Sequence, residues 1–92
     1  MNDMLSGERV MREGFGCGLR RYLFEPNTAN TRELIRQRIA EAITRWEPRA
    51  AVQQVTVTAD DADPRSAAVA IRFRLVATGA VERLGMTLTF ET

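Results

Sequence analysis

One amphipathic segment, residues 30–46, constrains the fold more than any other part of the chain. Its apolar residues recur at intervals of three and four, the period of a helix with one core-facing side; they are Ile35, Ile39, Ala42, Ile43 and Trp46. Pro48 has no backbone N–H group, and its ring disfavours the helical conformation for Glu47 before it. We therefore expect the helix to end at Trp46 or Glu47 and to be followed by a stiff corner, Glu47-Pro48-Arg49.

A second, shorter helix is expected ahead of this segment. Apolar side chains at helical spacing predict it from about Gly16 to Phe24, with Pro26 ending it. The long helix has two candidate N-caps in the intervening turn. Asn30, with an acidic residue (Glu33) three positions later, has the spacing of reciprocal capping, and Thr28 is the alternative.

The period of the apolar pattern changes from 3.6 to two after the corner. Apolar and polar side chains alternate over residues 55–59, 69–76 and 84–90, as they do in half-buried strands. Sequential strands with short links usually pair antiparallel. The sequence therefore predicts an α+β domain, with two helices packed on a three-stranded, mainly antiparallel sheet.

The open side of the last strand is a candidate for strand addition by another chain. A sheet edge exposes unpaired backbone groups that a foreign strand can use. Charged side chains at Glu82 and Arg83 are the alternative, because such residues can protect an edge.

Length and composition predict a single domain over residues 1–92 with a thin core. No apolar run approaches the roughly 20 residues of a membrane-spanning helix. The charged stretch from Met1 to Arg12 does not have the pattern of a secretory signal. We expect the protein to act where it is made, or to leave the cell only as part of a larger object.

Composition also argues against several kinds of site. Cys17 is the only cysteine and there is no histidine, so a Cys/His zinc site is excluded. The acidic turn at 60–66 lacks the glycine and the final glutamate of a calcium loop. We expect no metal and no cofactor. All thirteen basic residues are arginine, but the net charge is only +1, which favours protein interfaces over nucleic acid.

Four motifs together point to a family. They are Gly7-Glu8-Arg9-Val10-Met11 followed by Phe15-Gly16, Leu23-Phe24-Glu25-Pro26, the block at 42–49 that ends in Trp46-Glu47-Pro48-Arg49, and strands of the Val55-Thr56-Val57 kind. Over about residues 5–92 the chain resembles the baseplate wedge proteins of contractile phage tails. This family includes baseplate subunits of type VI secretion systems and tailocin-like particles. The Trp-Glu-Pro-Arg block after an amphipathic helix is the most specific motif.

The resemblance implies a structural protein without enzymatic activity. Such a subunit lies at the base of the contractile sheath, has a fold like the sheath protein's strand-exchanging (handshake) domain, and templates the first sheath ring by strand addition. Glu47, Pro48 and Arg49 would dock on the wedge core, with Glu8 and Arg9 as secondary contacts. The implied partners are sheath and wedge proteins, in six copies per particle. The particle would be a virion tail baseplate or a contractile injection particle, assembled in the bacterial cytoplasm.

Two alternatives remain open. Glu47 could simply pair with Arg49 or Arg45 within the fold. Because the family is often labelled lysozyme-like, a small peptidoglycan hydrolase is the alternative function. Glycoside hydrolysis needs two carboxylates about 5–9.5 Å apart beside a cleft. The acidic residue nine positions after a catalytic glutamate, typical of phage muramidases, is found only for Glu82, in a strand pattern. Glu8 and Glu47 would be the least unfavourable pair.

Overall fold

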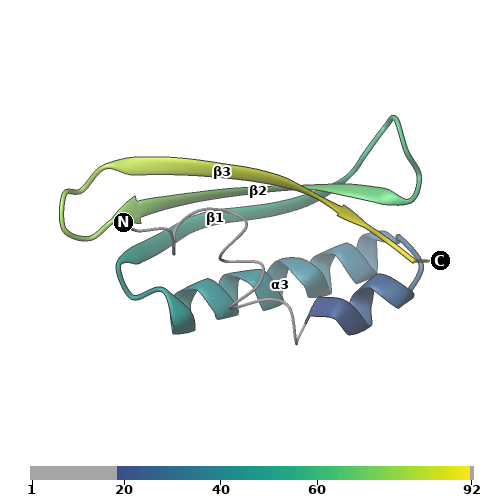
Figure 1. Ribbon diagram of the computed structural model, residues 1–92, viewed down its shortest axis with the longest axis horizontal. Helices are drawn as coiled ribbons and strands as arrows, with labels where there is room; N and C mark the ends of the chain where they lie inside the picture. Colours follow the sequence, from purple (N-terminus) through teal and green to yellow (C-terminus); the bar gives the residue numbers. More distant parts are fainter. Residues whose placement is uncertain (1–18, 92) are drawn as a thin grey trace.

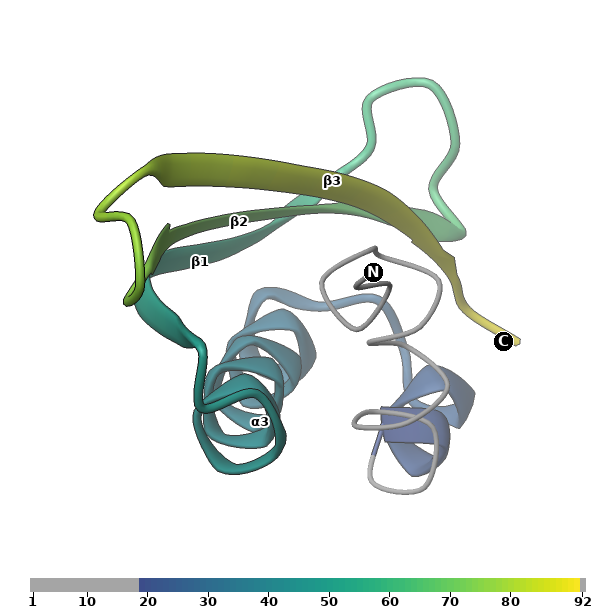
Figure 2. The ribbon, with the colours of Figure 1, turned by 60° about the vertical axis from the view of Figure 1, so that its left-hand side comes forward.

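The computed structural model describes residues 19–91, and the account that follows concerns those residues. A short 3₁₀ helix, η3 (Arg20–Phe24), precedes the long helix α3 (Ala29–Trp46). Three strands follow, β1 (Ala50–Ala59), β2 (Ser66–Leu75) and β3 (Val81–Thr89). They form one sheet in the order β1-β2-β3 with both pairs antiparallel. Both helices lie on the same face of this sheet (Figures 1 and 2). The α+β class and the three-stranded antiparallel sheet are confirmed.

The predicted pair of α-helices is not found in the described part of the chain. Where the second helix was expected, the structure has the five-residue 3₁₀ helix η3, and the expected start at Gly16 lies outside the described residues. Glu25 is extended, as a residue before proline usually is, and its N–H donates to the carbonyl of Tyr22 at 3.1 Å. So short a segment cannot sustain α-helical hydrogen bonding on its own.

Thr28, and not Asn30, caps α3. The Thr28 hydroxyl accepts a hydrogen bond from the backbone N–H of Thr31 at 3.2 Å, whereas Asn30 is already inside the helix. Glu33 does not reach back to the cap, because it accepts two hydrogen bonds from Arg36, the shorter at 2.7 Å. The preferred cap was therefore wrong and the alternative correct. The predicted end at Trp46 is confirmed.

The core lies between α3 and the inner face of the sheet. The helix contributes Ile35, Ile39, Ala42 and Ile43, and the sheet contributes Val55, Val69, Ile71, Phe73 and Leu88, all buried. Trp46, predicted to belong to this stripe, is 56% exposed. Figure 1 shows the reason, since α3 and the sheet separate toward the C-terminal end of the helix. The Trp46 ring instead lies under the guanidinium of Arg45, 5.5 Å from its centre.

A β-bulge lies in β1. The register with β2 shifts between Val52 and Gln54, which places one extra residue in β1. The strand begins at Ala50, five residues before the predicted alternation begins at Val55. Ala50 and Val55 are both buried although they are five residues apart. Strict alternation would place them on opposite faces, and the extra residue of the bulge restores both to the core side.

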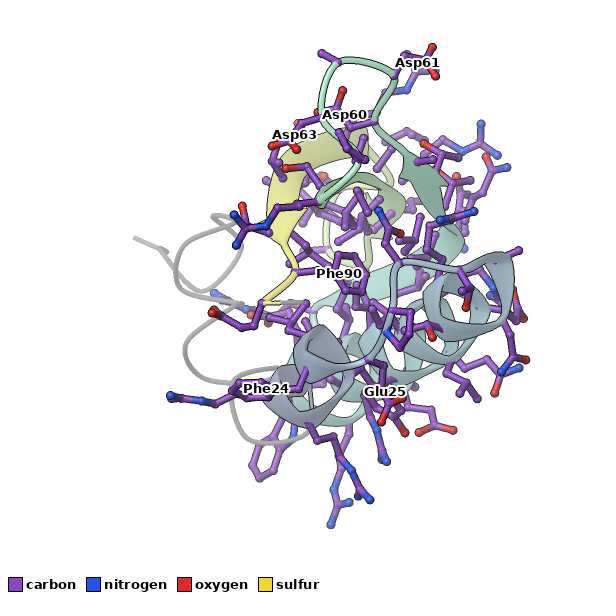
Figure 3. The ribbon with its side chains drawn as sticks, turned by 90° about the vertical axis from the view of Figure 1, so that its right-hand side faces the viewer. Phe24, Glu25, Asp60, Asp61, Asp63 and Phe90 are labelled. Carbon is purple, nitrogen blue, oxygen red and sulfur yellow. The ribbon has the colours of Figure 1, made fainter. Side chains whose placement is uncertain are left out.

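Both strand connections use the turn chemistry that their sequences suggest. Gly79 has φ +77°, which suits glycine, in the turn between β2 and β3. In the loop between β1 and β2, the Asp60 carboxylate accepts from the N–H of Ala62, and that of Asp63 accepts from the N–H of Arg65 and the hydroxyl of Ser66. These bonds hold the pKa of Asp63 below its usual range. Figure 3 shows this loop projecting away from the helices.

Phe90 joins the end of the sheet to η3. Its ring is fully buried, and its N–H donates to the carbonyl of Arg65 at 2.7 Å. The next N–H, of Glu91, donates to the carbonyl of Leu23 at 2.7 Å. Phe24, by contrast, is 56% exposed. Both phenylalanines are labelled in Figure 3, where Phe90 lies between the sheet and the helices.

We expect Phe90→Ala to lower the free energy of unfolding by about 3–5 kcal/mol, because it removes a fully buried ring and leaves a cavity. Phe24→Ala, the same change at an exposed site, should lower it by less than about 0.5 kcal/mol. Urea unfolding followed by circular dichroism measures both. Equal effects of the two substitutions would contradict this account of the core.

Candidate docking site

The corner between α3 and β1 is held by an ion pair. Two hydrogen bonds join Arg49 to the Glu47 carboxylate, from Nε to Oε1 at 2.8 Å and from Nη2 to Oε2 at 3.2 Å. The N–H of Ala50 also donates to the Glu47 carbonyl at 3.1 Å, which closes the turn. The Glu47 side chain is only 5% exposed, whereas that of Arg49 is 52% exposed. The corner therefore presents Pro48 and part of the Arg49 guanidinium to solvent.

The hydrogen bonds from Arg49 lower the pKa of the Glu47 carboxyl, although its burial acts in the opposite direction. The carboxylate is thus charged at neutral pH and is satisfied by its neighbour two residues away. This is the internal pairing that the sequence left open as an alternative, and it involves Arg49 and not Arg45. A general acid needs a raised pKa, so the environment of Glu47 is the reverse of what glycoside hydrolysis requires.

An open, mostly apolar hollow of about 450 Å³ lies beside the corner, lined by Pro48, Arg49, Leu75, Val76, Ala77 and Thr78. The end of β2 meets the corner because the N–H of Val76 donates to the carbonyl of Arg49 at 2.9 Å. Val76 itself is strongly exposed. None of the described residues that line this hollow carries a carboxylate, and its chemistry suits an apolar side chain next to an acidic one. One sign of this hollow is visible in the sequence, since Val76 is apolar at a position where the alternation of β2 calls for a polar residue.

The open edge of β3 is the second candidate surface. The N–H of Phe90 donates to Arg65 and that of Leu75 to Ala80, which fixes the alternation of hydrogen-bonded pairs between β2 and β3. The odd-numbered residues 81–89 consequently point their N–H and C=O groups away from β2. Within residues 19–91 no strand pairs with this edge. The opposite edge, on β1, is interrupted by the bulge.

Two other predicted contact residues, Glu8 and Arg9, lie outside the described residues. The structure therefore does not relate them to the corner. In the part of the chain that is described, no three His, Cys, Asp or Glu side chains are grouped so that they could hold a metal ion. None of the described helices combines the length and the apolar character needed to span a membrane.

Comparison with known proteins defines the class. The profile of the family described as baseplate wedge protein gp25 matches residues 3–80 of this chain. The chain belongs to the baseplate wedge gp25 family, and the resemblance stated from its motifs is confirmed. Its role is accordingly that of a structural protein of a phage-tail baseplate, with other baseplate proteins as partners. A search of curated proteins finds no match.

A solved structure shares this fold. A protein from Geobacter sulfurreducens, provisionally named a tail lysozyme, is 31% identical in sequence and superimposes with a TM-score of 0.73. The match covers 94% of this chain and 78% of that one. The name of that protein refers to lysozyme activity, but the similarity itself concerns sequence and fold.

We expect Glu47→Gln to flatten the pH dependence of stability in acid. The pKa of Glu47 is lower in the folded chain than in the unfolded chain, where a glutamate titrates near 4.3. The ion pair therefore stabilises the fold above that pH, and this stabilisation is lost as the pH falls through the lowered pKa. Glutamine does not titrate, so the variant should lose less stability between about pH 5 and pH 2.

Urea unfolding across this pH range is the measurement, with Glu33→Gln as the comparison. Arg36 and Gln37 lower the pKa of Glu33 from 4.5 to about 2, but this pair is exposed and solvent screens it. A Glu47→Gln profile that runs parallel to the wild-type profile would contradict the assigned role of the buried carboxylate.

Proposed function

We propose that this chain is the sheath-initiating subunit of a contractile tail baseplate. It docks on the wedge core through the corner at Glu47-Pro48-Arg49 and offers the edge of β3 as the template on which the first sheath ring assembles. The observation that carries the proposal is the edge of β3, which pairs with no strand within residues 19–91, in a member of a baseplate wedge family.

The corner is suited to docking because it is rigid before a partner arrives. Pro48 fixes one backbone angle, and the two hydrogen bonds to Glu47 hold the Arg49 side chain in place. Ordering a flexible arginine at an interface costs free energy, and here much of that cost is met within the subunit. In this proposal Glu47 orients Arg49, while Arg49 and Pro48 contact the partner. Glu8 and Arg9 are proposed as secondary contacts.

The adjacent hollow adds an apolar component to the same surface. Arginine beside a water-excluding apolar pocket is a common composition for the energetic centre of an interface. A wedge segment with an apolar side chain in the hollow and a carboxylate on Arg49 would use both features.

The β3 edge is the better of the two edges for strand addition. Its register with β2 is regular from Val81 to Thr89, and five of its residues point backbone groups outward. Main-chain hydrogen bonds at such an edge give affinity without requiring a particular partner sequence. The bulge in β1 twists that strand and disrupts regular pairing there.

The proposed partners are therefore the wedge proteins and the sheath protein, with six subunits in a sixfold particle. Assembly would take place in the bacterial cytoplasm, in a phage tail, a type VI secretion apparatus or a tailocin. A peptidoglycan hydrolase is not proposed, because the hollow at the corner has no carboxylate among its described lining residues and the Glu47 carboxyl has a lowered pKa. Turnover of purified sacculi that is lost in Glu8→Gln or Glu47→Gln would favour the enzyme.

Arg49→Ala should lower incorporation into assembled particles by more than about tenfold, because an arginine at the centre of an interface contributes more than about 1.4 kcal/mol. Arg36→Ala is the matched control. It breaks an Arg–Glu pair of the same two-bond geometry in the first half of α3, away from the corner, and should leave incorporation unchanged. Quantitative mass spectrometry of purified particles measures the yield.

The double variant Glu47→Gln/Arg49→Ala separates docking from folding. It removes the carboxylate that Arg49→Ala alone would leave buried and unpaired. Circular dichroism should show a folded chain, and particles should still lack it. Wild-type incorporation of this folded double variant would refute docking through the corner.

Thr87→Pro tests the edge. The N–H of Thr87 points away from β2, so proline removes an outward donor while the hydrogen bonds between β2 and β3 remain. We expect a folded chain that enters baseplates but recruits little sheath protein. Thr87→Ala, which keeps the donor, should recruit sheath normally. Normal sheath assembly on Thr87→Pro baseplates would show that β3 is not the template.

A further inference from the structure

The face of the sheet opposite α3 is uncovered in the described part of the chain. Figure 2 shows both helices below the sheet, and above it only the loop between β1 and β2, which projects at one end. An open hollow of about 430 Å³ lies on this outer face. Thr56, Ala70 and Gly85 line its middle, and Arg72 and Arg83 line one end with Gln54 beside them. These residues face each other across the three strands.

Gly85 is not required by the fold of the chain itself. Its φ is not positive, since Gly79 is the only described glycine with that conformation. Among the described residues, the nearest atom to a Cβ built on Gly85 would be the carbonyl oxygen of Val69 at 3.8 Å, which is an ordinary contact. Glycine inside a strand weakens it, and one use of such a glycine is to let another backbone or a ligand approach closely.

The arginines at the end of the hollow are unfavourably placed for an isolated chain. Arg72 and Arg83 are directly opposite in a pair that is not hydrogen-bonded, the arrangement in which side chains on antiparallel strands are closest. Like charges in this position destabilise a sheet. Neither forms an ion pair with another described residue. The Nε of Arg72 is buried without a hydrogen-bond partner among the described residues.

We propose that this hollow is a docking site for a protein segment that carries an aspartate or glutamate. The carboxylate lies between Arg72 and Arg83, where it offsets their repulsion and accepts hydrogen bonds from their guanidinium groups. The backbone that carries it passes over Ala70 and Gly85, where small side chains leave room. Within the hollow the charge is confined to one end of a small, otherwise neutral floor, and Arg74 lies beyond that end, two residues after Arg72 on the same face of β2. This arrangement fits a single side-chain carboxylate better than a polyphosphate backbone, which needs a row of cations.

Two substitutions test the proposal, Gly85→Val for the space and Arg83→Gln for the charge. Valine keeps the outward N–H of β3 and adds a side chain that favours strands. The melting temperature of the isolated chain should therefore rise by about 2–8 °C. Arg83→Gln should raise it by about 1–5 °C by removing the repulsion. Incorporation of both into particles should fall by more than about tenfold, because the site is filled or loses its anion contact.

The controls are Thr89→Val, on the same face but outside the hollow, and Arg20→Gln, an exposed arginine on η3; both should incorporate normally. Wild-type incorporation of Gly85→Val and Arg83→Gln would overturn the proposal. A lowered melting temperature would do the same, because it would show that the fold itself needs these residues.

A second experiment does not depend on the proposed role in the baseplate. The isolated chain is titrated with polyglutamate and with an oligothymidylate of equal charge, and the amide resonances of Ala70 and Gly85 are followed. We expect shifts with polyglutamate that disappear in Arg83→Gln. No shift with polyglutamate, or shifts with the oligonucleotide alone, would overturn the proposal. If Arg49→Ala blocks incorporation while Arg83→Gln does not, docking through the corner stands and this inference fails.

Discussion

The two hydrogen bonds between Arg49 and Glu47 join the end of α3 to the start of β1, and much of the structure depends on this link. Pro48 ends the helix, but a proline alone does not determine where the chain goes next. The ion pair and the bond from Ala50 to the Glu47 carbonyl direct it into β1. The strand then runs back along α3, so that the apolar side of the helix meets the inner face of the sheet. The same contact leaves Glu47 buried and Arg49 half exposed.

Local sequence rules predicted most of the elements, because their causes are local. The interval of the isoleucines fixed the helix, Pro48 fixed its end, and alternation fixed the three strands. The errors have long-range causes. Trp46 has the right helical phase for the core, yet α3 and the sheet separate at its end. Asn30 and Thr28 are both good caps, and the choice between them depends on where the chain enters the helix. The bulge in β1 is invisible in the sequence because Gln53 has no distinctive chemistry.

The site was predictable in part. The sequence indicated a polar corner at residues 47–49, and it also left open the internal pairing of Glu47 that the structure contains. It could not show that Val76 meets Arg49 across 27 positions and so creates the hollow beside the corner. On the outer face, the opposition of Arg72 and Arg83 depends on the register of two strands. Nothing in the sequence alone distinguished Gly85 from other glycines. Its backbone angle and the open space around it showed that the fold does not require glycine there.

The bulge in β1 makes the sheet asymmetric. A sheet that accepts strands on both sides can be inserted anywhere within a continuous series of exchanged strands, whereas a sheet with one usable side can occupy only an end of the series. If β3 accepts a strand as proposed, the irregular β1 margin would give the series a direction of growth. The one-residue bulge in β1 would then distinguish the initiating subunit of a polymer from its repeating subunits.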